Sequence, residues 1–318
     1  MNNNELIVIA LGGNALLNSK SKGSIEEREE AADKTAEQLH DVLSSDFRVV
    51  LTHGNGPQVG NILIQNEEAA SKVPPMPLDV CVAETQGEIG YVLQKSIQND
   101  FRRKGIDKQI LTILTQVMVD ENDPAFSKFS KPIGPYYNEN QKNEILRNKK
   151  DWVFAKDPAG KGFRRVVPSP KPIKINEARI IKDLLNNNYL VIAVGGGGIP
   201  VYYNSNKDEI RGVEAVIDKD LASARLAIDI NADKLIILTN VDYCYINFKK
   251  ENQITLKDMN LDEANTYIEQ GHFSAGSMGP KVQAAIEFVT STGKKAIISS
   301  IERLNDALNG KAGTVIHP

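Results

Sequence analysis

The sequence predicts an α/β fold: a three-layer αβα sandwich around a mostly parallel sheet, with a small inserted lid-like subdomain. Two observations lead to this prediction. Short apolar runs rich in β-branched residues alternate with long helical patterns, which is typical of parallel strands joined by crossover helices. A proline-rich stretch near the middle of the chain interrupts that alternation, which indicates an insertion.

The expected strands and helices follow one another in a regular order. Each apolar run is bounded by turn or polar residues, so we expect strands that are buried on both faces. These strands are Leu6–Leu11, Val49–Thr52, Ile110–Leu114, Leu190–Val194 and Leu235–Thr239. The helical patterns include Ser24–Leu43, Asp79–Arg103, Asn176–Leu185, Asp220–Asp229 and Gly279–Thr290. Ser24 and Glu27 have the spacing of a capping box, which marks where the first of these helices begins.

Residues 119–172 are predicted to form the inserted, protruding subdomain. Seven prolines set this stretch apart: Pro124, Pro132, Pro135, Pro158, Pro168, Pro170 and Pro172. Two short strands are expected within it, at Trp152–Ala155 and Arg164–Val167. A connection this long inside a compact domain is more often functional than idle, so we expect a lid.

Composition and charge exclude several classes of protein. The 38 basic and 41 acidic side chains give a net charge of −3, so no overall positive field exists to hold nucleic acid or an anionic membrane. No apolar run approaches the ~18 residues of a membrane-spanning helix, and the amino terminus lacks a signal-peptide pattern, so we expect a cytoplasmic protein. Cys81 and Cys244 lie far apart outside any CxxC pattern, so we expect small core residues rather than a zinc site or a disulfide.

Three of the predicted strands end directly in glycine-rich turns. The turns are Gly12-Gly13-Asn14, Gly54-Asn55-Gly56 and Gly195-Gly196-Gly197-Gly198. Ligands of open parallel sheets bind outside the carboxyl ends of the strands, so we expect the three turns to meet in one crevice. Glycine lets backbone N–H groups approach a ligand closely, and a following helix points its positive end there, which favours phosphate-like anions. A single such turn would be weak evidence, but three are hard to explain as turns alone.

These turns match neither common nucleotide fingerprint. The P-loop pattern G-x-x-x-x-G-K-[ST] is absent from the chain. The segment Gly54–Gly60 places Val59 where the dinucleotide fingerprint requires Gly or Ala, and Pro57 also argues against that fingerprint. A dinucleotide-dependent oxidoreductase is therefore a minor alternative, which saturable NAD binding would test.

Phosphoryl transfer needs cations around the transferred group, and three lysines beside turn residues are candidates. Lys131 begins the segment KPIGP (131–135) in the insertion, whose two prolines and glycine would fix the backbone around it. Lys219 and Lys281 each lie at the start of a predicted helix. A lysine in the first turn of a helix opposes the helix dipole, so an anionic ligand would explain two of them there. The alternative is that each is a solvated surface lysine. Asp220 could hold the lysine ammonium groups, approach a magnesium ion, or cap its helix.

Two other segments have weaker signals. His53 follows a strand and could be a general base, but no Ser–His–Asp or metal-ligand spacing accompanies it, so a structural role is favoured. The segment Thr239–Asp242 follows another strand and could line a nucleotide base or ribose, although alone it would be an ordinary loop.

Seven segments spread over nearly the whole chain form a joint pattern. They are ALGGNA (10–15), LTHGNGPQVG (51–60), KPIG (131–134), RVVPSP (165–170), GGGGIP (195–200), VIDKDL (216–221) and GSMGPK (276–281). In this order the pattern resembles the carbamate kinases of the amino acid kinase superfamily. The resemblance implies one amino acid kinase-like domain over residues 1–318 and a homodimer. It also implies reversible phosphoryl transfer between ATP and carbamate, usually run from carbamoyl phosphate and ADP towards ATP, in fermentative arginine catabolism.

The resemblance also implies roles for individual residues. Gly12, Gly13, Asn14, Gly54, Asn55, Gly56, Gly196 and Gly197 would surround carbamate and the transferred phosphoryl group. Lys131, Lys219 and Lys281 would stabilise that group, with Asp220 organising the lysines. Lys219, Thr239, Asn240, Val241, Asp242, Met278 and Lys281 would lie on the nucleotide side. Mg²⁺ is expected to accompany ATP or ADP, and no metal ion held by the protein alone is expected.

One departure within the superfamily supports this assignment. Related acyl-phosphate kinases carry a lysine two residues before the Gly-Gly pair, where this chain has Ala10, so Lys131 is expected to supply the missing charge. Two further functions stay open: a kinase that phosphorylates another small acid, and a catalytically silent regulatory module. A silent module should have lost a charged site residue, whereas the three lysines and Asp220 are all present.

Overall fold

The computed structural model describes residues 4–12, 23–157, 160–274 and 278–318. At its centre is an eight-stranded sheet in the order β15-β17-β16-β12-β1-β2-β9-β3. In that order the strands are Asp258–Asn260, Thr314–His317, Lys295–Ser300, Lys234–Thr239, Leu6–Ala10, Arg48–Thr52, Leu190–Ile192 and Ile110–Thr112. Within this sheet only β16 and β17 pair antiparallel among the described strands, so the prediction of a mostly parallel sheet is confirmed.

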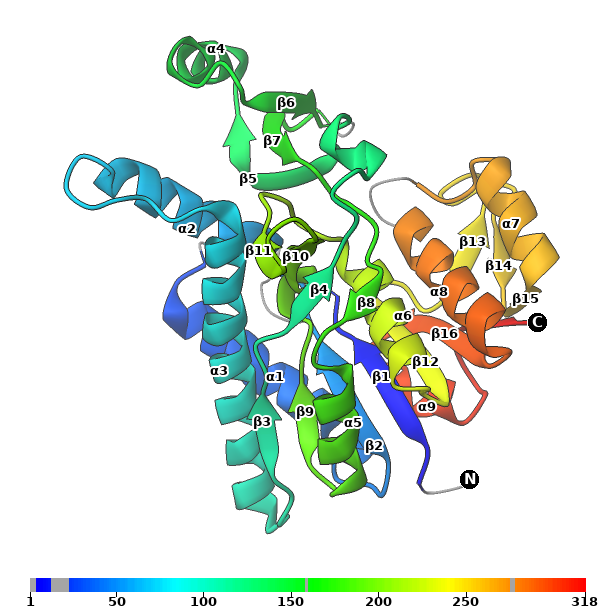
Figure 1. Ribbon diagram of the computed structural model, residues 1–318. Coiled ribbons are helices and arrows are strands. Elements are labelled where there is room, and N and C mark those ends of the chain that lie inside the picture. The colour runs from blue at the N-terminus through cyan, green and yellow to red at the C-terminus, as the bar shows by residue number, and fades with distance from the viewer. Residues whose placement is uncertain (1–3, 13–22, 158–159, 275–277) are drawn as a thin grey trace.

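Helices cover both faces of the sheet and complete the three predicted layers (Figure 1). One face packs against α1 (Ile25–Leu43), α3 (Leu78–Lys104) and α9 (Leu304–Leu308) in one apolar cluster. The other face packs against α5 (Ala178–Asn186), α6 (Lys219–Asp229), α7 (Leu261–Glu269) and α8 (Met278–Thr292) in a second cluster. The sheet is therefore buried on both sides, as the uninterrupted apolar runs of its strands require.

Strand β1 lies in the middle of the sheet and shows how the sequence produces the layers. Leu6, Val8 and Ala10 contribute to the cluster under α6 and α8. Ile7 and Ile9 point the other way, into the cluster under α1 and α3. Successive side chains of a strand alternate between faces, so an entirely apolar run supplies both cores. Each buried isoleucine or leucine contributes roughly 1.5–3 kcal/mol relative to exposure.

Helix α1 begins where the sequence predicts. Ser24 is its N-cap, and its Oγ accepts a hydrogen bond from the Glu27 backbone N–H at 3.4 Å. The Glu27 carboxylate in turn accepts from the backbone N–H groups of Ser24 and Gly23. The predicted capping box is confirmed, and it satisfies backbone donors that the first turn would otherwise leave unpaired.

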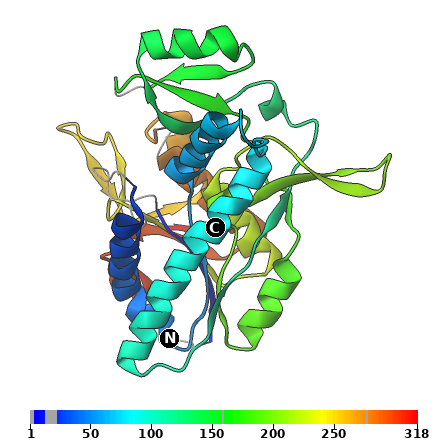
Figure 2. The same ribbon diagram turned by 90° about the vertical axis from the view of Figure 1, so that its left-hand side faces the viewer.

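Smaller sheets flank the central one. A four-stranded sheet has the order β11 (Glu209–Gly212), β10 (Ile199–Asn204), β4 (Gln116–Met118) and β8 (Lys174–Ile175), and its β10–β11 hairpin projects from the body in Figure 2. Strands β13 (Cys244–Ile246) and β14 (Ile254–Leu256) form a separate hairpin, and η3 (Gly195–Gly197) is a short 3₁₀ turn after β9.

The insertion contains a sheet of its own. Strands β5 (Lys131–Tyr137), β7 (Phe163–Val167) and β6 (Val153–Lys156) pair antiparallel, and α4 (Glu139–Asn148) lies beyond them. This unit protrudes from one end of the molecule (Figure 1, Figure 2). Both predicted strands are present: the first lies one residue later at both ends, and the second begins one residue earlier. The turn η2 (Pro124–Phe126) lies in the connection that leads to β5. The boundaries 119–172 stay a prediction, since the separate sheet itself runs from residue 131 to 167.

Helix α2 (Gly56–Ala69) was not among the predicted helices, and it supports the inserted sheet. A Cβ atom on Gly60 would lie 2.1 Å from the Cα atom of Gly134 on β5, so the two backbones touch where glycine alone fits. Further along the same contact the Arg165 guanidinium lies 3.8 Å from the centre of the Trp152 ring. Lys131 is the first residue of β5, so this packing fixes where its backbone lies.

Two further sequence expectations concern the core and the environment. Cys81 and Cys244 are both buried in apolar clusters, as expected for small core residues. Among the helices in the described part of the chain, none is long and apolar enough to span a bilayer.

Candidate active site

The three glycine turns meet at the carboxyl ends of neighbouring strands. β1, β2 and β9 are adjacent in the sheet. The backbone N–H of Gly196 donates to the carbonyl of His53 at 2.7 Å, which joins the turn after β9 to the turn after β2. The N–H of Leu11, just before Gly12, donates to the carbonyl of Thr52 at 2.9 Å. The expectation that these turns converge is confirmed for Gly12, Gly54–Gly56 and Gly195–Gly198, whereas Gly13 and Asn14 lie outside the described residues.

Close packing explains the glycines after β9. A Cβ atom on Gly196 would lie 2.3 Å from the amide nitrogen of Asn55, and one on Gly197 would lie 2.2 Å from the carbonyl oxygen of Ile217. Both glycines also have positive φ, of 67° and 94°, which side chains rarely tolerate. Asn55 is itself buried and donates to the hydroxyl of Thr85 at 2.9 Å. The backbone of this turn is therefore packed closely against Asn55 and Ile217, which leaves no room for side chains at Gly196 and Gly197.

A buried cluster of two lysines and one aspartate lies beside these turns. The two carboxylate oxygens of Asp220 accept from Lys219 Nζ at 2.6 Å and from Lys281 Nζ at 2.9 Å. Asp220 is only 3% exposed. The Lys219 chain passes the turn after β2, because a Cβ atom on Gly54 would lie 3.5 Å from Lys219 Cδ. The cluster therefore unites the first turns of α6 and α8 with one of the glycine turns.

The first turn of α6 is also tied to the sheet. The hydroxyl of Ser223 donates to the carbonyl of Lys219 at 2.6 Å, so the hydroxyl of Thr52, 2.6 Å away, is the donor to Ser223. All of these groups are well packed, and Thr52 and Ser223 are fully buried. This connection holds the lysine-bearing turn of α6 at the end of β2.

Burial and charge act against each other in this cluster. Burial lowers the pKa of Lys219, while the negative charge of Asp220 opposes that shift. Burial would by itself raise the pKa of Asp220, but the two neighbouring ammonium groups hold it well below its usual range. Asp220 is therefore an anion at neutral pH, and it allows two cations to share a buried site.

Lys131 reaches the same helix end from the inserted sheet. Its Nζ lies 2.7 Å from Oδ2 of Asp218, and the other oxygen of Asp218 accepts from the backbone N–H groups of Asp220 and Leu221. Asp218 is therefore the N-cap of α6. The alternative that Asp220 caps this helix was wrong, because the helix begins at Lys219 and Asp220 lies inside its first turn. Sequence reasoning gave Asp218 no role, although it immediately precedes the predicted helix.

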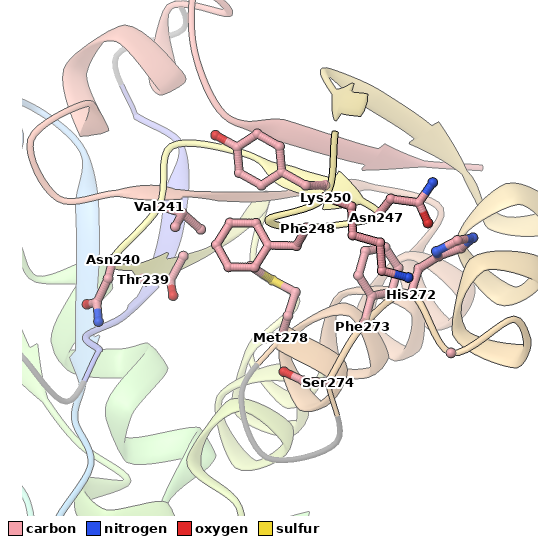
Figure 3. Close-up of a pocket in the computed structure, with 12 residues that line it drawn as sticks. Thr239, Asn240, Val241, Asn247, Phe248, Lys250, His272, Phe273, Ser274 and Met278 are labelled. Atoms are coloured by element: carbon pink, nitrogen blue, oxygen red, sulfur yellow. The ribbon is translucent and has the colours of Figure 1, made fainter. Parts of the chain in front are cut away.

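A cavity of about 520 Å³ is lined on one side by Met278, the first residue of α8 (Figure 3). Four residues predicted for the nucleotide side line it: Thr239, Asn240, Val241 and Met278. Lys219, Asp242 and Lys281 do not line it. The Asp242 carboxylate instead accepts from the hydroxyl of Ser300 at 2.5 Å. Lining residues that the sequence did not indicate are Tyr245, Asn247, Phe248, Lys250 and Gly271–Ser274.

The aromatic wall of this cavity comes from the β13–β14 hairpin. Phe248 and Tyr245 are stacked, with ring centres 5.5 Å apart and planes inclined by 27°. Phe248 is 47% exposed although it is large and apolar. Figure 3 places it across the cavity from Asn240 and beside Met278. An exposed aromatic ring facing a sulfur atom and amide groups suits a flat heterocyclic ligand.

His53 is buried and uncharged. Its Nδ1–H donates to the carbonyl of Gly54 at 3.0 Å, and its Nε2 has no partner among the described residues. Burial lowers the pKa of His53 to about 4, opposed by the bond to Gly54 and reinforced by the charge of Lys219. A group that is neutral and already packed against Gly195 fits the structural role that the sequence favoured.

The low pKa of His53 predicts that the free energy of unfolding decreases at acidic pH. Its folded pKa lies below the ordinary value of 6.5, so the unfolded chain takes up a proton first and stability falls as the pH drops from 6.5 towards 4. The shift corresponds to about 3 kcal/mol over that range. In urea unfolding at a series of pH values, His53→Gln should lose this component and give a flatter curve. Parallel curves for the two proteins would contradict the prediction.

Comparison with known proteins gives one consistent answer. The sequence model of the amino acid kinase family matches residues 5–300. The chain is 46% identical to carbamate kinase from Pyrococcus horikoshii over 316 residues, which covers 99% of each chain. It is 45% identical to carbamate kinase from Trichomonas vaginalis over 313 residues, 98% of this chain and 99% of the relative.

Solved structures agree with the sequence relatives. Carbamate kinase from Giardia lamblia bound to AMP-PNP superposes with a TM-score of 0.91 and 44% identity, covering 100% of this chain and 99% of the other. Both the sequence alignment and the superposition extend over nearly the whole chain. The chain therefore belongs to the amino acid kinase family and, within it, to the carbamate kinases.

Proposed function

We propose that phosphoryl transfer between ATP and carbamate takes place at the first turn of α6, with Lys131, Lys219 and Lys281 stabilising the transferred group. The arrangement of Asp220 is the observation that carries this proposal. It holds two lysine ammonium groups at 2.6 and 2.9 Å in a buried site, which leaves further N–H donors on each for phosphate oxygens. Charge spreads over the equatorial oxygens during transfer, and preorganised cations stabilise it best where water is excluded.

The reaction needs no protein nucleophile and no general base. Carbamate is already an anion, so no proton has to be removed before its oxygen attacks the γ-phosphoryl group in line. A neutral His53 with a pKa of about 4 is consistent with this. Gly12, Gly54, Gly56, Gly196 and Gly197 would surround carbamate and the phosphoryl group, with Gly13, Asn14 and Asn55 assigned beside them by resemblance to the family.

The donor set fits a magnesium ion that arrives with the nucleotide. Both oxygens of Asp220 bind lysines, and the described residues contain no group of three or more His, Cys, Asp or Glu side chains that could hold a metal. Mg²⁺ commonly keeps its waters and binds through substrate phosphates, where it would neutralise charge. The protein supplies the lysines that complete this neutralisation.

The cavity beside Met278 would hold the nucleotide. The related Giardia structure contains AMP-PNP, which supports a nucleotide in this enzyme. The Phe248 and Tyr245 rings would contact the base, and Thr239, Asn240 and Val241 would line its other side, with Asp242 further back against Ser300. Lys219 and Lys281 would then lie towards the phosphates.

Phe248 is expected to contribute to nucleotide affinity and not to chemistry. Phe248→Ala should raise KM for ADP by roughly 10-fold, because an aromatic contact contributes about 0.5–1.5 kcal/mol beyond its area. The turnover number should change little, since a contact made equally in ground and transition states lowers KM only. Steady-state kinetics with ADP would measure this, and Tyr203→Ala, an exposed tyrosine on the β10–β11 hairpin, is the control. An unchanged KM would remove Phe248 from the nucleotide site.

The wider setting is also proposed. The enzyme would act as a cytoplasmic homodimer in fermentative arginine catabolism, running from carbamoyl phosphate and ADP towards ATP. The inserted sheet, with residues 119–172 as its subdomain, would act as a lid over the substrates, with Lys131 held at the phosphoryl group.

The deciding experiment measures ATP formation from MgADP and carbamoyl phosphate, beside acetyl phosphate and a Lys131→Ala variant. Rapid synthesis with carbamoyl phosphate, much slower with acetyl phosphate and lowered roughly 10²-fold in the variant, is the expected result. Equal rates with both donors would point to a less selective small-acid kinase. No synthesis from either would favour a regulatory role, and normal turnover of the variant would exclude Lys131 from the mechanism.

A further inference from the structure

The side chain of Asp218 joins the inserted sheet to the body of the enzyme at the reaction site. One carboxylate oxygen accepts from the Asp220 N–H at 2.9 Å and from the Leu221 N–H at 3.4 Å. The other accepts from Lys131 Nζ at 2.7 Å. Lys131 is 87 positions away in sequence, on a sheet that otherwise packs mainly against α2. The carboxylate of Asp218 therefore caps the N-terminus of α6 and also binds the lysine from the insertion.

We propose that Asp218 is a positioning residue: it fixes the ammonium group of Lys131 at the N-terminus of α6, within reach of the phosphoryl group held by Lys219 and Lys281. This inference rests on the proposed function of the three lysines. Asp218 would hold the ammonium group of Lys131 in the way that Asp220 holds those of Lys219 and Lys281.

Geometry favours positioning over an ordinary surface ion pair. An exposed lysine–carboxylate pair is worth little, because both side chains move and water screens them. Here the Asp218 and Lys131 side chains are only 16% and 28% exposed. The helix cap also holds the Asp218 carboxylate through its second oxygen, so the acceptor cannot rotate away. A free lysine side chain would lose rotamer entropy when it binds the substrate. Because Asp218 already holds Lys131 in one position, that entropy is lost before the substrate binds.

The pairing leaves Lys131 able to act. An ammonium group has three N–H donors, and Asp218 uses one, so two remain for phosphate oxygens. Among the described residues, the carboxylates that form ion pairs with Lys131, Lys219 and Lys281 are those of Asp218 and Asp220. These five side chains together carry one net positive charge, and the positive end of α6 adds to it.

Two substitutions separate positioning from helix capping. Asp218→Ser retains a good N-cap but lacks an oxygen that reaches Lys131, and Asp218→Asn keeps the cap and the length while losing the charge. We expect both to lower kcat by about 10–10²-fold, with KM for ADP little changed, because misplacing one catalytic group acts on the transition state. Urea unfolding should show nearly native stability, since Ser and Asn cap helices as well as Asp.

The double variant Asp218→Ser/Lys131→Ala makes the test decisive. If Asp218 acts through Lys131, then Asp218→Ser should cause no further loss once Lys131 is alanine. A further loss of full size in that background would show that Asp218 acts on α6 itself and would overturn the inference. Normal kcat in Asp218→Ser, with Lys131→Ala impaired, would overturn it while the proposed function stands. Normal kcat in Lys131→Ala would overturn it together with the proposed role of Lys131 in the reaction.

Discussion

Replacing Lys219 by methionine should lower the turnover number by roughly 10²–10³-fold and leave the protein folded. The variant removes one of the two cations that Asp220 holds, while Lys281 remains 2.9 Å from the carboxylate, so no buried charge is left unpaired. Methionine has nearly the length of lysine and suits a buried position beside Gly54. Steady-state ATP synthesis from MgADP and carbamoyl phosphate would measure the turnover, and thermal unfolding would report on the fold.

A matched control distinguishes loss of a site cation from loss of any lysine. Lys95 also binds a single carboxylate, that of Glu29, but on the outer surface of α3, where its side chain is 33% exposed. Lys95→Met should therefore have native turnover. If Lys219→Met turned over as fast as this control, the cation at position 219 would have no part in catalysis.

Most of the fold could be predicted because it depends on local patterns. An apolar run such as Leu6–Ala10 supplies both cores of the sheet, because its alternate side chains point to opposite faces and all of them are apolar. The convergence of the glycine turns followed from the rule that parallel strands carry ligands at their carboxyl ends. Helix α2 escaped prediction because it begins directly within the glycine turn at Gly56-Pro57, where turn signals mask the helical pattern.

The candidate site was less predictable because its partners are distant in sequence. Lys219 and Lys281 oppose the dipoles of their helices, from which the sequence predicted an anionic ligand; that ligand stays a prediction, and Asp220 provides a compensating anion within the protein. The pairing of Lys131 with Asp218 depends on how an inserted sheet packs, and no local pattern encodes that. Likewise Phe248 and Tyr245 become a cavity wall only when the β13–β14 hairpin folds beside Met278.

Asp220→Asn is expected to damage both stability and catalysis, unlike the lysine variant. It leaves Lys219 and Lys281 buried without a counter-ion, and removing one partner of a buried ion pair typically costs about 3–5 kcal/mol. The carboxyl pKa is held well below its ordinary value of 3.8, so the stabilisation is complete above about pH 4 and is lost as the pH falls further. Urea unfolding should therefore show the largest difference from wild type near neutral pH. Glu29→Gln, on the exposed pair with Lys95, should change stability by less than about 1 kcal/mol.

The activity of Asp220→Asn should also depend on pH in the direction opposite to simple acid inactivation. Burial already lowers the pKa of Lys219, and the Asp220 charge is the main force that opposes this shift. Without that charge Lys219 loses its proton more readily, so the residual turnover should rise as the pH is lowered and the lysine becomes protonated again. A pH profile of kcat that matched wild type in shape would show that Asp220 does not keep Lys219 charged, and its role would reduce to packing.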